Sequence, residues 1–316
     1  MIIRGPFLES LVYRLPLRTR FRGIDVRDGV LLRGPAGWGE FSPFWDYDAP
    51  AARRWWEATA EAALVGWPEP VRTSVPVNVT VPAVGPEQAH AIVSASGCRT
   101  AKVKVAEPGQ SPGDDIARVE AVRDALGPGG AIRVDANAGW DVDTAVTRIR
   151  ELDRVGLEYV EQPCPSLAEL AVLRRRIDVR VAADEVVRQA ADPLRVDLRE
   201  ASDVVVLKVH PLGGVRASLR VAEAHGLPCV VSSALESSVG MAAGVALAAA
   251  LPELPFACGL ATVALFTDDV TAQPLLPVHG TIPVRRVVPD RLIPADAGTE
   301  RAWQDRLDAL QVGTAA

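Results

Sequence analysis

The chain contains only three lysines, and two of them stand two residues apart. Lysine and arginine together number 34, of which 31 are arginine. Lys102 and Lys104 lie in a β-branched stretch, and Lys208 stands alone. Residues i and i+2 of a strand point to the same face. A desolvated lysine can lose its proton and act as a general base, whereas arginine cannot. The pair therefore predicts a general base on the inner face of a strand; the alternative is a solvated strand face.

Three acidic residues follow apolar stretches at nearly constant spacing. Asp135, Glu161 and Asp184 each end a stretch of mostly apolar residues. From Asp135 to Lys208 the successive steps are 26, 23 and 24 residues, each the length of one strand–helix unit. The carboxyl ends of the strands in a parallel barrel meet at one face. The spacing therefore predicts that these four side chains lie at one level on successive strands.

Three carboxylates that converge in a buried site repel one another and take up protons unless a cation neutralises them. Asp135, Glu161 and Asp184 would offer oxygen ligands alone. Such ligands suit a hard divalent ion, so the residues predict Mg²⁺, with Mn²⁺ as a substitute. The alternative interpretation is that each acid caps the helix that follows its strand.

The lysines would flank this metal. Lys102 and Lys104 precede the carboxylates in strand order, and Lys208 follows them. A substrate carboxylate bound to the metal would therefore lie between two amines. This arrangement suits removal of a proton α to a carboxylate, with the metal holding the enediolate that forms.

The elements that would position these residues alternate regularly. Apolar strands separated by single helices imply a parallel sheet covered on its outer face. Eight strands and seven helices predict a modified TIM-type α/β barrel, (β/α)7β, over residues 76–261. An open doubly wound sheet is the alternative, but no G-x-G-x-x-G follows the first strand. The predicted strands are 76–81, 101–106, 131–136, 158–162, 179–183, 204–210, 228–233 and 256–259, and the predicted helices are 86–96, 113–126, 142–155, 167–176, 192–199, 214–225 and 238–250.

The two ends of the chain predict an α+β capping domain. Residues 1–75 hold five of the seven tryptophans, short strands and a helix with Pro50 at its start and Gly66 at its end. Residues 262–316, with a late strand at 280–284 and a helix at 299–310, are expected to complete this domain. The basic segment 18–25 is expected to be a loop, either a lid whose Arg20 meets an anionic substrate or a solvated surface loop.

Composition excludes several classes of protein. Hydrophobic residues at 48% and charged residues at 23% are typical of a globular protein with a large core. The net charge of −6 argues against nucleic acid as the main partner. Residues 239–251 are too short to span a bilayer, and the N-terminus shows no signal peptide. The four cysteines lack C-x-x-C spacing, so we expect reduced thiols in a cytoplasmic protein. The sequence sets no oligomeric state, and a small carboxylate is the expected partner.

The motifs resemble those of the muconate-lactonizing subgroup of the enolase superfamily, over nearly the whole chain. In that superfamily a lysine or histidine base acts beside Mg²⁺, which stabilises an enediolate. The matching motifs are Lys102-x-Lys104, Asp135-x-Asn137, Glu161-Gln-Pro163, Asp184-Glu185 and Lys208, behind an α+β cap.

The resemblance implies a role for each motif residue. Asp135, Glu161 and Asp184 would be the metal ligands. Lys104 would take the α-proton and then protonate the departing hydroxyl on the same face, which gives a syn elimination. Lys208 would place its cation over the π face of the enediolate.

Other residues would support these groups. Lys102 would bind the substrate carboxylate and tune Lys104. Asn137 and Glu185 would lie behind the ligands as a second layer.

Two further stretches, residues 37–43 (GWGEFSP) and 232–240 (SSALESSVG), resemble particular lyases of the subgroup. Those hydro-lyases dehydrate 2-succinyl-6-hydroxy-2,4-cyclohexadiene-1-carboxylate (SHCHC) to o-succinylbenzoate in menaquinone biosynthesis. By this resemblance Ser237, Ser238 and Gly240 would hold the succinyl carboxylate at a helix N-terminus. The alternative for the serines is ordinary N-capping.

Two other functions fit the same residues. An N-succinylamino-acid racemase or dipeptide epimerase needs two opposed bases, which Lys104 and Lys208 could supply. Pro211 stands where such racemases are expected to carry arginine, and residues 232–240 lack the Asp-x-Asp pair typical of dipeptide epimerases. A binding protein that has lost catalysis is the non-enzymatic alternative, and the complete set of lysines and acids argues against it.

Overall fold

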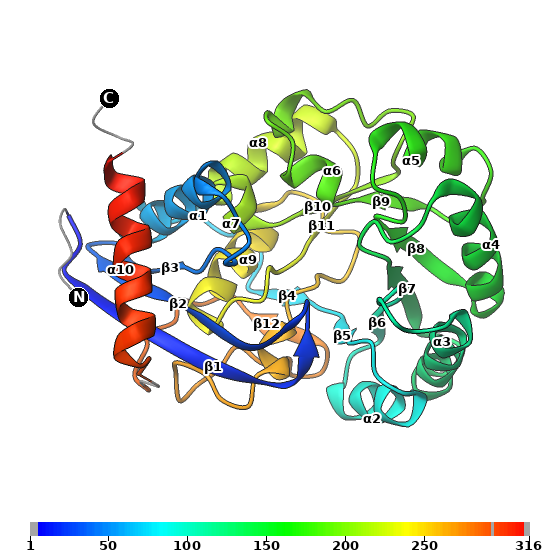
Figure 1. The fold of residues 1–316 in the computed structure, drawn as a ribbon, viewed down its shortest axis with the longest axis horizontal. Helices are drawn as coiled ribbons and strands as arrows, with labels where there is room; N and C mark the ends of the chain where they lie inside the picture. Colours follow the sequence, from blue (N-terminus) through cyan, green and yellow to red (C-terminus); the bar gives the residue numbers. More distant parts are fainter. Residues whose placement is uncertain (1–5, 292–293, 313–316) are drawn as a thin grey trace.

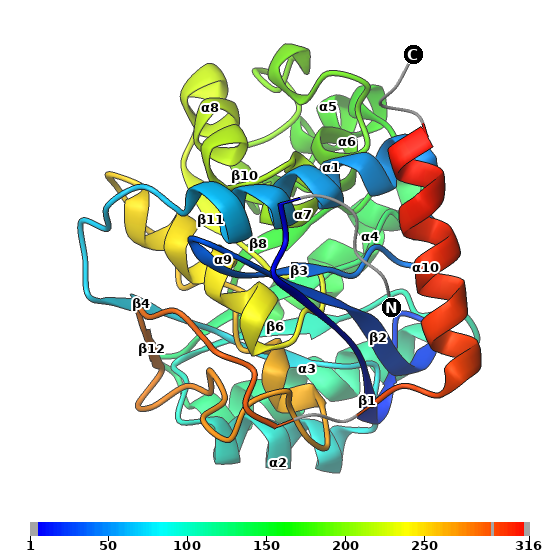
Figure 2. The same cartoon turned by 90° about the vertical axis from the view of Figure 1, so that its left-hand side faces the viewer.

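The computed structural model describes residues 6–291 and 294–312 of the chain. It has two parts, a barrel wrapped by helices and a cap built from both ends of the chain (Figures 1 and 2). The predicted cap also includes residues 1–5, 292–293 and 313–316, which lie outside the described residues. The predicted division at residues 75 and 261 stays a prediction.

Seven parallel strands form the barrel wall in the order β11-β10-β9-β8-β7-β6-β5. Their residues are mostly buried, because helices cover the outer face and side chains fill the interior. The strands are β5 Val79–Val81, β6 Thr100–Lys104, β7 Ala131–Asp135, β8 Leu157–Glu161, β9 Val181–Ala183, β10 Val204–Leu207 and β11 Cys229–Val231.

The barrel closes through single bridges at residues 256–259. Cys258 pairs in parallel with Val77, and Gly259 pairs in parallel with Ser232. The backbone N–H of Cys258 donates to the Pro76 carbonyl at 2.7 Å. The predicted eighth strand therefore occupies the gap between the first and seventh strands, with bridges in place of a regular strand.

Helices cover the barrel near their predicted bounds: α2 Pro86–Ser96, α3 Pro112–Leu126, α4 Val142–Leu152, α5 Leu167–Arg174, α8 Val215–His225 and α9 Ser238–Ala250. Two predictions were wrong. Residues 192–199 hold one 3₁₀ turn, Pro193–Arg195, because Asp192 caps only Leu194 N–H at 3.0 Å before the chain extends at Val196. Strand β10 ends at Leu207, where the chain turns into the short helix α7, Val209–Leu212.

The cap sheet is an antiparallel meander of β1 Glu9–Phe21, β2 Ile24–Gly34 and β3 Gly37–Phe41. Helix α1, Ala49–Ala60, packs beside it and continues into a π-helical turn, Glu61–Val65. The predicted basic loop at 18–25 was wrong. Strand β1 continues to Phe21 and β2 begins at Ile24, so Arg22 and Gly23 alone form the turn between them. Both residues have positive φ.

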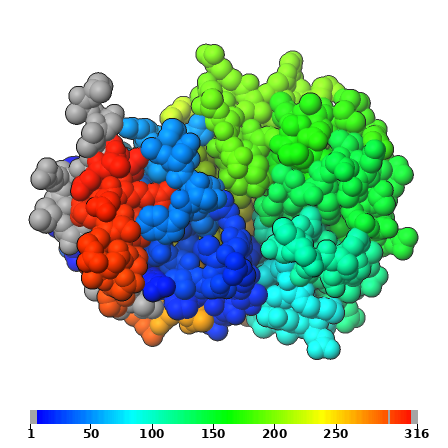
Figure 3. Space-filling model, in the orientation of Figure 1, coloured from blue at the N-terminus to red at the C-terminus, as the bar shows by residue number. Residues whose placement is uncertain are grey.

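The C-terminal segment returns to the N-terminal part, as expected. Strand β12, Thr281–Pro283, pairs antiparallel with β4, Ser74–Pro76. Helix α10, Ala297–Val312, lies beside β1 in both ribbon views. In the space-filling view the two chain ends, blue and red, adjoin on one side of the molecule and the green barrel residues fill the other (Figure 3).

The apolar stretch that was too short for a membrane forms α9, of which all residues but the last are buried. Within the described ranges no helix is long and apolar enough to cross a membrane. All four cysteines are buried and carry free thiols.

Trp303 anchors the tail to the cap and gives a test of this contact. It is fully buried, with its ring centroid 5.8 Å from that of Phe41, and its Nε1 donates to Asp28 at 3.2 Å. Trp303→Ala should lower the free energy of unfolding in urea by about 3–5 kcal/mol. Trp45, which is 51% exposed and also donates to Asp28, is the matched control. Equal losses for both alanine variants would contradict this assignment.

Candidate active site

A cavity of about 760 Å³ lies between the cap and the barrel mouth. The tip of the β1–β2 hairpin, with Arg20 and Phe21, forms one wall. The carboxyl ends of the barrel strands form the floor, where all three lysines of the chain line the cavity. The closed end of the long β1–β2 hairpin thus covers the face of the barrel that carries the predicted chemistry.

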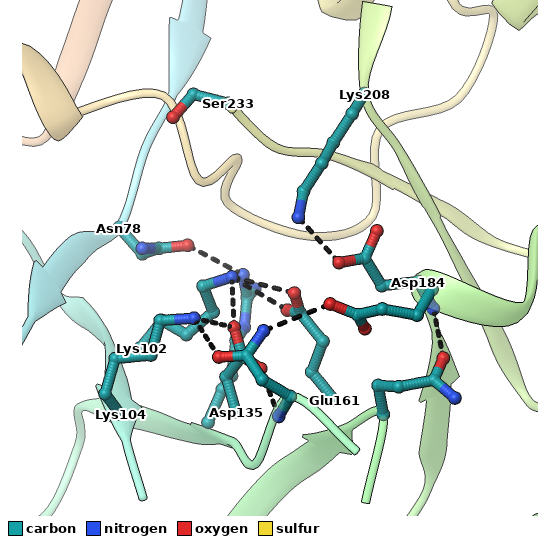
Figure 4. Close-up of polar contacts among 12 residues, drawn as sticks. Asn78, Lys102, Lys104, Asp135, Glu161, Asp184, Lys208 and Ser233 are labelled. Atoms are coloured by element: carbon teal, nitrogen blue, oxygen red, sulfur yellow. Dashed lines mark hydrogen bonds and ion pairs between the residues drawn. The ribbon is translucent and has the colours of Figure 1, made fainter. Parts of the chain in front are cut away.

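Strand register brings the acidic residues to one level, as their spacing predicted. Lys104 of β6 pairs with Asp135 of β7, and Asp135 pairs with Glu161 of β8. Asp184 follows β9 directly. The three acids are at most 1% exposed, and they lie between Lys102 and Lys104 on one side and Lys208 on the other (Figure 4).

Lysine ammonium groups lie between the carboxylates. Lys102 Nζ donates to both Glu161 oxygens at 2.8 and 3.0 Å and to Asp135 Oδ2 at 3.1 Å. Lys104 Nζ lies 2.6 Å from the same Asp135 oxygen. Lys102 is 5% exposed, which excludes the solvated strand face as an account of this residue. On this side of the cluster, two cations balance two anions.

Asp184 has its own pair of cations. Lys208 Nζ donates to its Oδ2 at 2.6 Å, and Arg188 Nε donates to its Oδ1 at 3.0 Å. Asp184 stands at the N-cap position of α6, Glu185–Arg188, but within the described chain its side chain makes no capping bond. The helix-cap interpretation therefore fails for this residue, whose carboxylate faces the lysine instead.

Burial and mutual repulsion shape the charges of the cluster. Burial, and next the neighbouring charge of Asp135, raise the pKa of Glu161 to about 7. Burial alone would raise the pKa of Asp184, but Arg188 and Lys208 outweigh it and lower that pKa to about 2. Burial opposes the charged form of Lys102, yet Glu161 and Asp135 hold its pKa well above the ordinary value. Lys102 is thus held as an ammonium ion.

Asn137 and Glu185, expected behind the ligands, both line the cavity, and a chain of polar contacts runs through them to the cap. Lys104 Nζ donates to Asn137 Oδ1 at 2.5 Å, and Asn137 Nδ2 donates to Glu185 Oε1 at 3.2 Å. Arg188 donates to the same Glu185 oxygen at 2.6 Å and to the hydroxyl of Tyr47 at 3.0 Å. Asn137 and Glu185 therefore link Lys104 to Arg188, the arginine that pairs with Asp184.

The expected substrate contacts of Ser237, Ser238 and Gly240 are not supported. All three residues are buried, and none is among the described residues that line the cavity. Ser237 is the N-cap of α9 and accepts from Val239 N–H at 3.2 Å, so the capping alternative holds for it. Their remaining polar groups bond other protein residues because the start of α9 packs under the cap.

Arg20 does line the cavity, but it pairs with Asp25 at 3.0 Å and two-thirds of its side chain is exposed. Sequence reasoning missed Arg188, Tyr47 and Ser233, which also line the cavity. The position of Arg188 four residues after Asp184 was a usable signal, because i and i+4 share a helix face. Ser233 lies in the motif stretch 232–240, which was a signal for it, whereas Tyr47 carried none.

The carboxylates are chemically suited to a hard cation, although the ammonium groups stand between them. Across the described residues no group of three or more Asp, Glu, His or Cys side chains is arranged as a metal site. Asp135, Glu161 and Asp184 nevertheless offer only oxygen donors, and burial together with the neighbouring charge of Asp135 raises the pKa of Glu161. A divalent cation would relieve that repulsion, so the donor set fits one.

Comparison with known proteins shows which family has this architecture. Family models described as "Enolase N-terminal domain-like" and "Enolase C-terminal domain-like" match residues 12–63 and 86–291. The muconate lactonizing enzyme of Pseudomonas fluorescens, complexed with muconolactone, has the same fold, with a TM-score of 0.76, 22% identity and coverage of 96% of this chain and 97% of that one. The dipeptide epimerase of Enterococcus faecalis, complexed with Mg and L-Leu-L-Tyr, gives a TM-score of 0.72 at 21% identity over 89% and 97% of the two chains. The chain belongs to the enolase superfamily.

A curated relative narrows the family further. The o-succinylbenzoate synthase of Thermobifida fusca is 66% identical over 305 residues, which cover 96% of each chain. Within the superfamily, the chain therefore belongs to the o-succinylbenzoate synthase family.

The buried charge balance predicts unequal effects of two lysine substitutions in the metal-free protein. Lys102→Met removes the ammonium bonded to both Glu161 and Asp135, and should lower the free energy of unfolding in urea by about 3–5 kcal/mol, because breaking a buried pair leaves an uncompensated charge. Lys208→Met is the matched control, since Asp184 keeps Arg188. A larger loss for the control would refute this charge assignment.

Proposed function

We propose that this protein catalyses the metal-dependent syn-dehydration of SHCHC to o-succinylbenzoate, a step of menaquinone biosynthesis in the cytoplasm. It is then a carbon–oxygen hydro-lyase, which acts on a small carboxylate substrate. The observation that carries the proposal is the pair Lys104 and Lys208 at one cavity floor with three buried carboxylates, in a chain 66% identical to a curated o-succinylbenzoate synthase.

The proposed metal ligands are Asp135, Glu161 and Asp184, and the proposed ion is Mg²⁺, with Mn²⁺ as a substitute. Oxygen donors and the Mg in the related dipeptide epimerase structure support this choice. Such an ion would supply positive charge for the substrate carboxylate when an α-proton leaves.

Lys104 is the proposed base for the proton on the ring carbon next to the carboxylate. It reaches the cavity from β6, with its Nζ 5.5 Å from the ring centroid of Phe21 in the hairpin tip. Lys102 stays an ammonium ion, as its raised pKa indicates, so it is suited to bind the substrate carboxylate. This division of labour gives the two neighbouring lysines different tasks.

The elimination then uses one face of the ring. The C–H electron pair forms the new C=C bond, the neighbouring C–O bond breaks, and Lys104 returns its proton to the departing hydroxyl to give water. Lys208, which follows β10 on the other side of the carboxylates, would oppose the negative charge that develops on the substrate. Asn137 and Glu185 keep Lys104 oriented through the contacts described above.

The second candidate is racemisation of N-succinylamino acids or epimerisation of dipeptides. One observation favours it: Lys104 and Lys208 both line the cavity and come from opposite sides of the carboxylates. Pro211 lines the cavity at the position where such racemases would carry arginine. Asp269 lies behind α9, where it accepts from Ser238 N–H at 3.2 Å, so it is not placed to bind a substrate ammonium.

Substitutions of Lys104 and Lys208 distinguish a residue that acts as a base from one that supplies only positive charge. Lys104→Ala should slow loss of the SHCHC chromophore by at least about a hundredfold, the usual contribution of a general base. Lys104→Arg should be as slow, because arginine keeps the charge but cannot accept a proton. Lys208→Arg should retain more activity than Lys208→Ala, because only its charge is needed for dehydration.

Full turnover by the alanine variants would show that this mechanism is wrong. Deuterium exchange into N-succinylamino acids without dehydration of SHCHC would favour the racemase, and Lys208→Arg would then lose one direction of exchange.

Metal removal gives an independent test. Dialysis against EDTA should abolish dehydration of SHCHC, and added Mg²⁺ should restore it, because three buried carboxylates and no histidine or thiol would form the site. Ca²⁺ serves as the matched control, since its larger radius and looser geometry should restore less activity. Activity that survives thorough chelation would remove the metal from the mechanism.

A further inference from the structure

The stretch 37–43 is not used by the catalytic site as described. Of the described residues that line the cavity, none comes from this stretch. Its Glu40 is nevertheless 1% exposed, in β3 at the boundary between the cap and the barrel. A buried carboxylate is costly unless hydrogen-bond donors surround it.

Donors from both parts of the molecule surround Glu40. From the cap, the Tyr13 hydroxyl and Ser42 Oγ donate to its Oε1 at 2.7 and 2.8 Å. From the barrel, Ser237 N–H donates to Oε1 at 3.3 Å, Gly240 N–H donates to Oε2 at 3.0 Å, and the Ser237 hydroxyl also donates to Oε2. Glu40 thus fills the positive N-terminus of α9 with a carboxylate of the protein itself.

Gly240 is required for this approach. A Cβ at that position would lie 2.8 Å from the carboxyl carbon of Glu40 and 2.7 Å from Cβ of Glu236. The stretches 37–43 and 232–240 are therefore partners, although the sequence separates them by most of the barrel.

Arg27, in β2, holds the chain just before α9. It is 2% exposed, and its Nε donates to the Leu235 carbonyl at 3.0 Å while its guanidinium lies 4.1 Å over the Phe44 ring. Leu235 has φ of 66°, a left-handed conformation that costs free energy for a residue with a branched side chain. Both Leu235 and Ser233 line the cavity. The cap thus holds a strained part of the cavity wall from behind.

Segment 233–235 faces a different part of the cavity from the charged cluster. Ser233 lies across the opening from Lys102 and Lys104 (Figure 4). We propose that Glu40 and Arg27 are positioning residues. They keep segment 233–235 in the shape that receives the end of the substrate remote from Asp135, Glu161 and Asp184. This inference rests on the proposed function, for which that end is the succinyl chain of SHCHC.

Steady-state kinetics of Glu40→Gln and Arg27→Met test the proposal. Each variant should raise KM for SHCHC about tenfold, the effect of losing one hydrogen bond to a charged group, and change kcat less than about twofold. Arg27→Lys should restore part of the loss, because an ammonium can still donate to the Leu235 carbonyl. The catalytic lysines are untouched, so a fall in kcat alone would contradict the proposal.

Arg72→Met is the matched control. Arg72 donates to the carbonyls of Ala248 and Pro252, at the other end of the same helix. This variant should lower the midpoint of thermal unfolding without changing KM. If Glu40→Gln and Arg27→Met behave in the same way, their role is structural and the proposal is wrong.

A substitute variant and a substitute substrate allow the positioning role to be tested in every case. If Glu40→Gln does not fold, Ser42→Ala takes its place. This variant removes one donor to Glu40 and one acceptor of Arg27. The same rise in KM is expected, and an unchanged KM would refute the proposal. If the wild type does not dehydrate SHCHC, the proposed function fails. The KM comparison is then made with an N-succinylamino acid, and an unchanged KM for that substrate would overturn the positioning role by itself.

Discussion

The balance of buried charge at the barrel mouth is the constraint on which the rest of the structure depends. Three carboxylates with almost no exposed surface stand on adjacent strands, and each lies next to at least one cation. In a low dielectric an unpaired charge would cost several kcal/mol, so the acids and lysines must arrive together. Parallel register achieves this, because one strand–helix unit carries each group to the same level of the barrel.

The chain uses its two basic residue types differently, although Arg188 also stands at the site beside Asp184. All three lysines line the cavity, and Lys104 is the one proposed to take up and return a proton, which arginine could not do. Arginines hold backbone carbonyls elsewhere: Arg54, Arg118, Arg123 and Arg306 each donate to main-chain oxygens that join different elements. A planar group with five donors and a permanent charge suits that structural task.

The cap contributes more than a cover, since it supplies the anion that stabilises the start of α9 and the cation that holds Leu235. Among the described cap residues, the hairpin tip and the segment around Phe44 and Tyr47 line the cavity, while Glu40 and Arg27 contact the barrel wall from behind. Function in this fold therefore depends on contacts between parts of the chain that are far apart in sequence.

The local sequence pattern predicted the regular helices correctly. It failed where contacts with other parts of the chain decide the local structure. Helices α2 and α9 have the predicted bounds, because Pro86 and Ser237 mark their starts and good helix formers follow each of them. The segment at 192–199 was predicted as a helix but forms a single turn, and residues 18–21 extend the 13-residue strand β1, whose partner is the 11-residue strand β2. A strand partner is a long-range fact that composition does not carry.

The sequence by itself determined the barrel, the level of Asp135, Glu161 and Asp184, and the lysines beside them, since repeat length and strand period are local quantities. Tertiary structure alone decided what the start of α9 binds. The sequence predicted an N-terminus ready for a carboxylate, and the fold filled it with Glu40, which lies 197 residues before Ser237. An N-terminus attracts any anion, and only the packing of the cap on the barrel selects which one arrives.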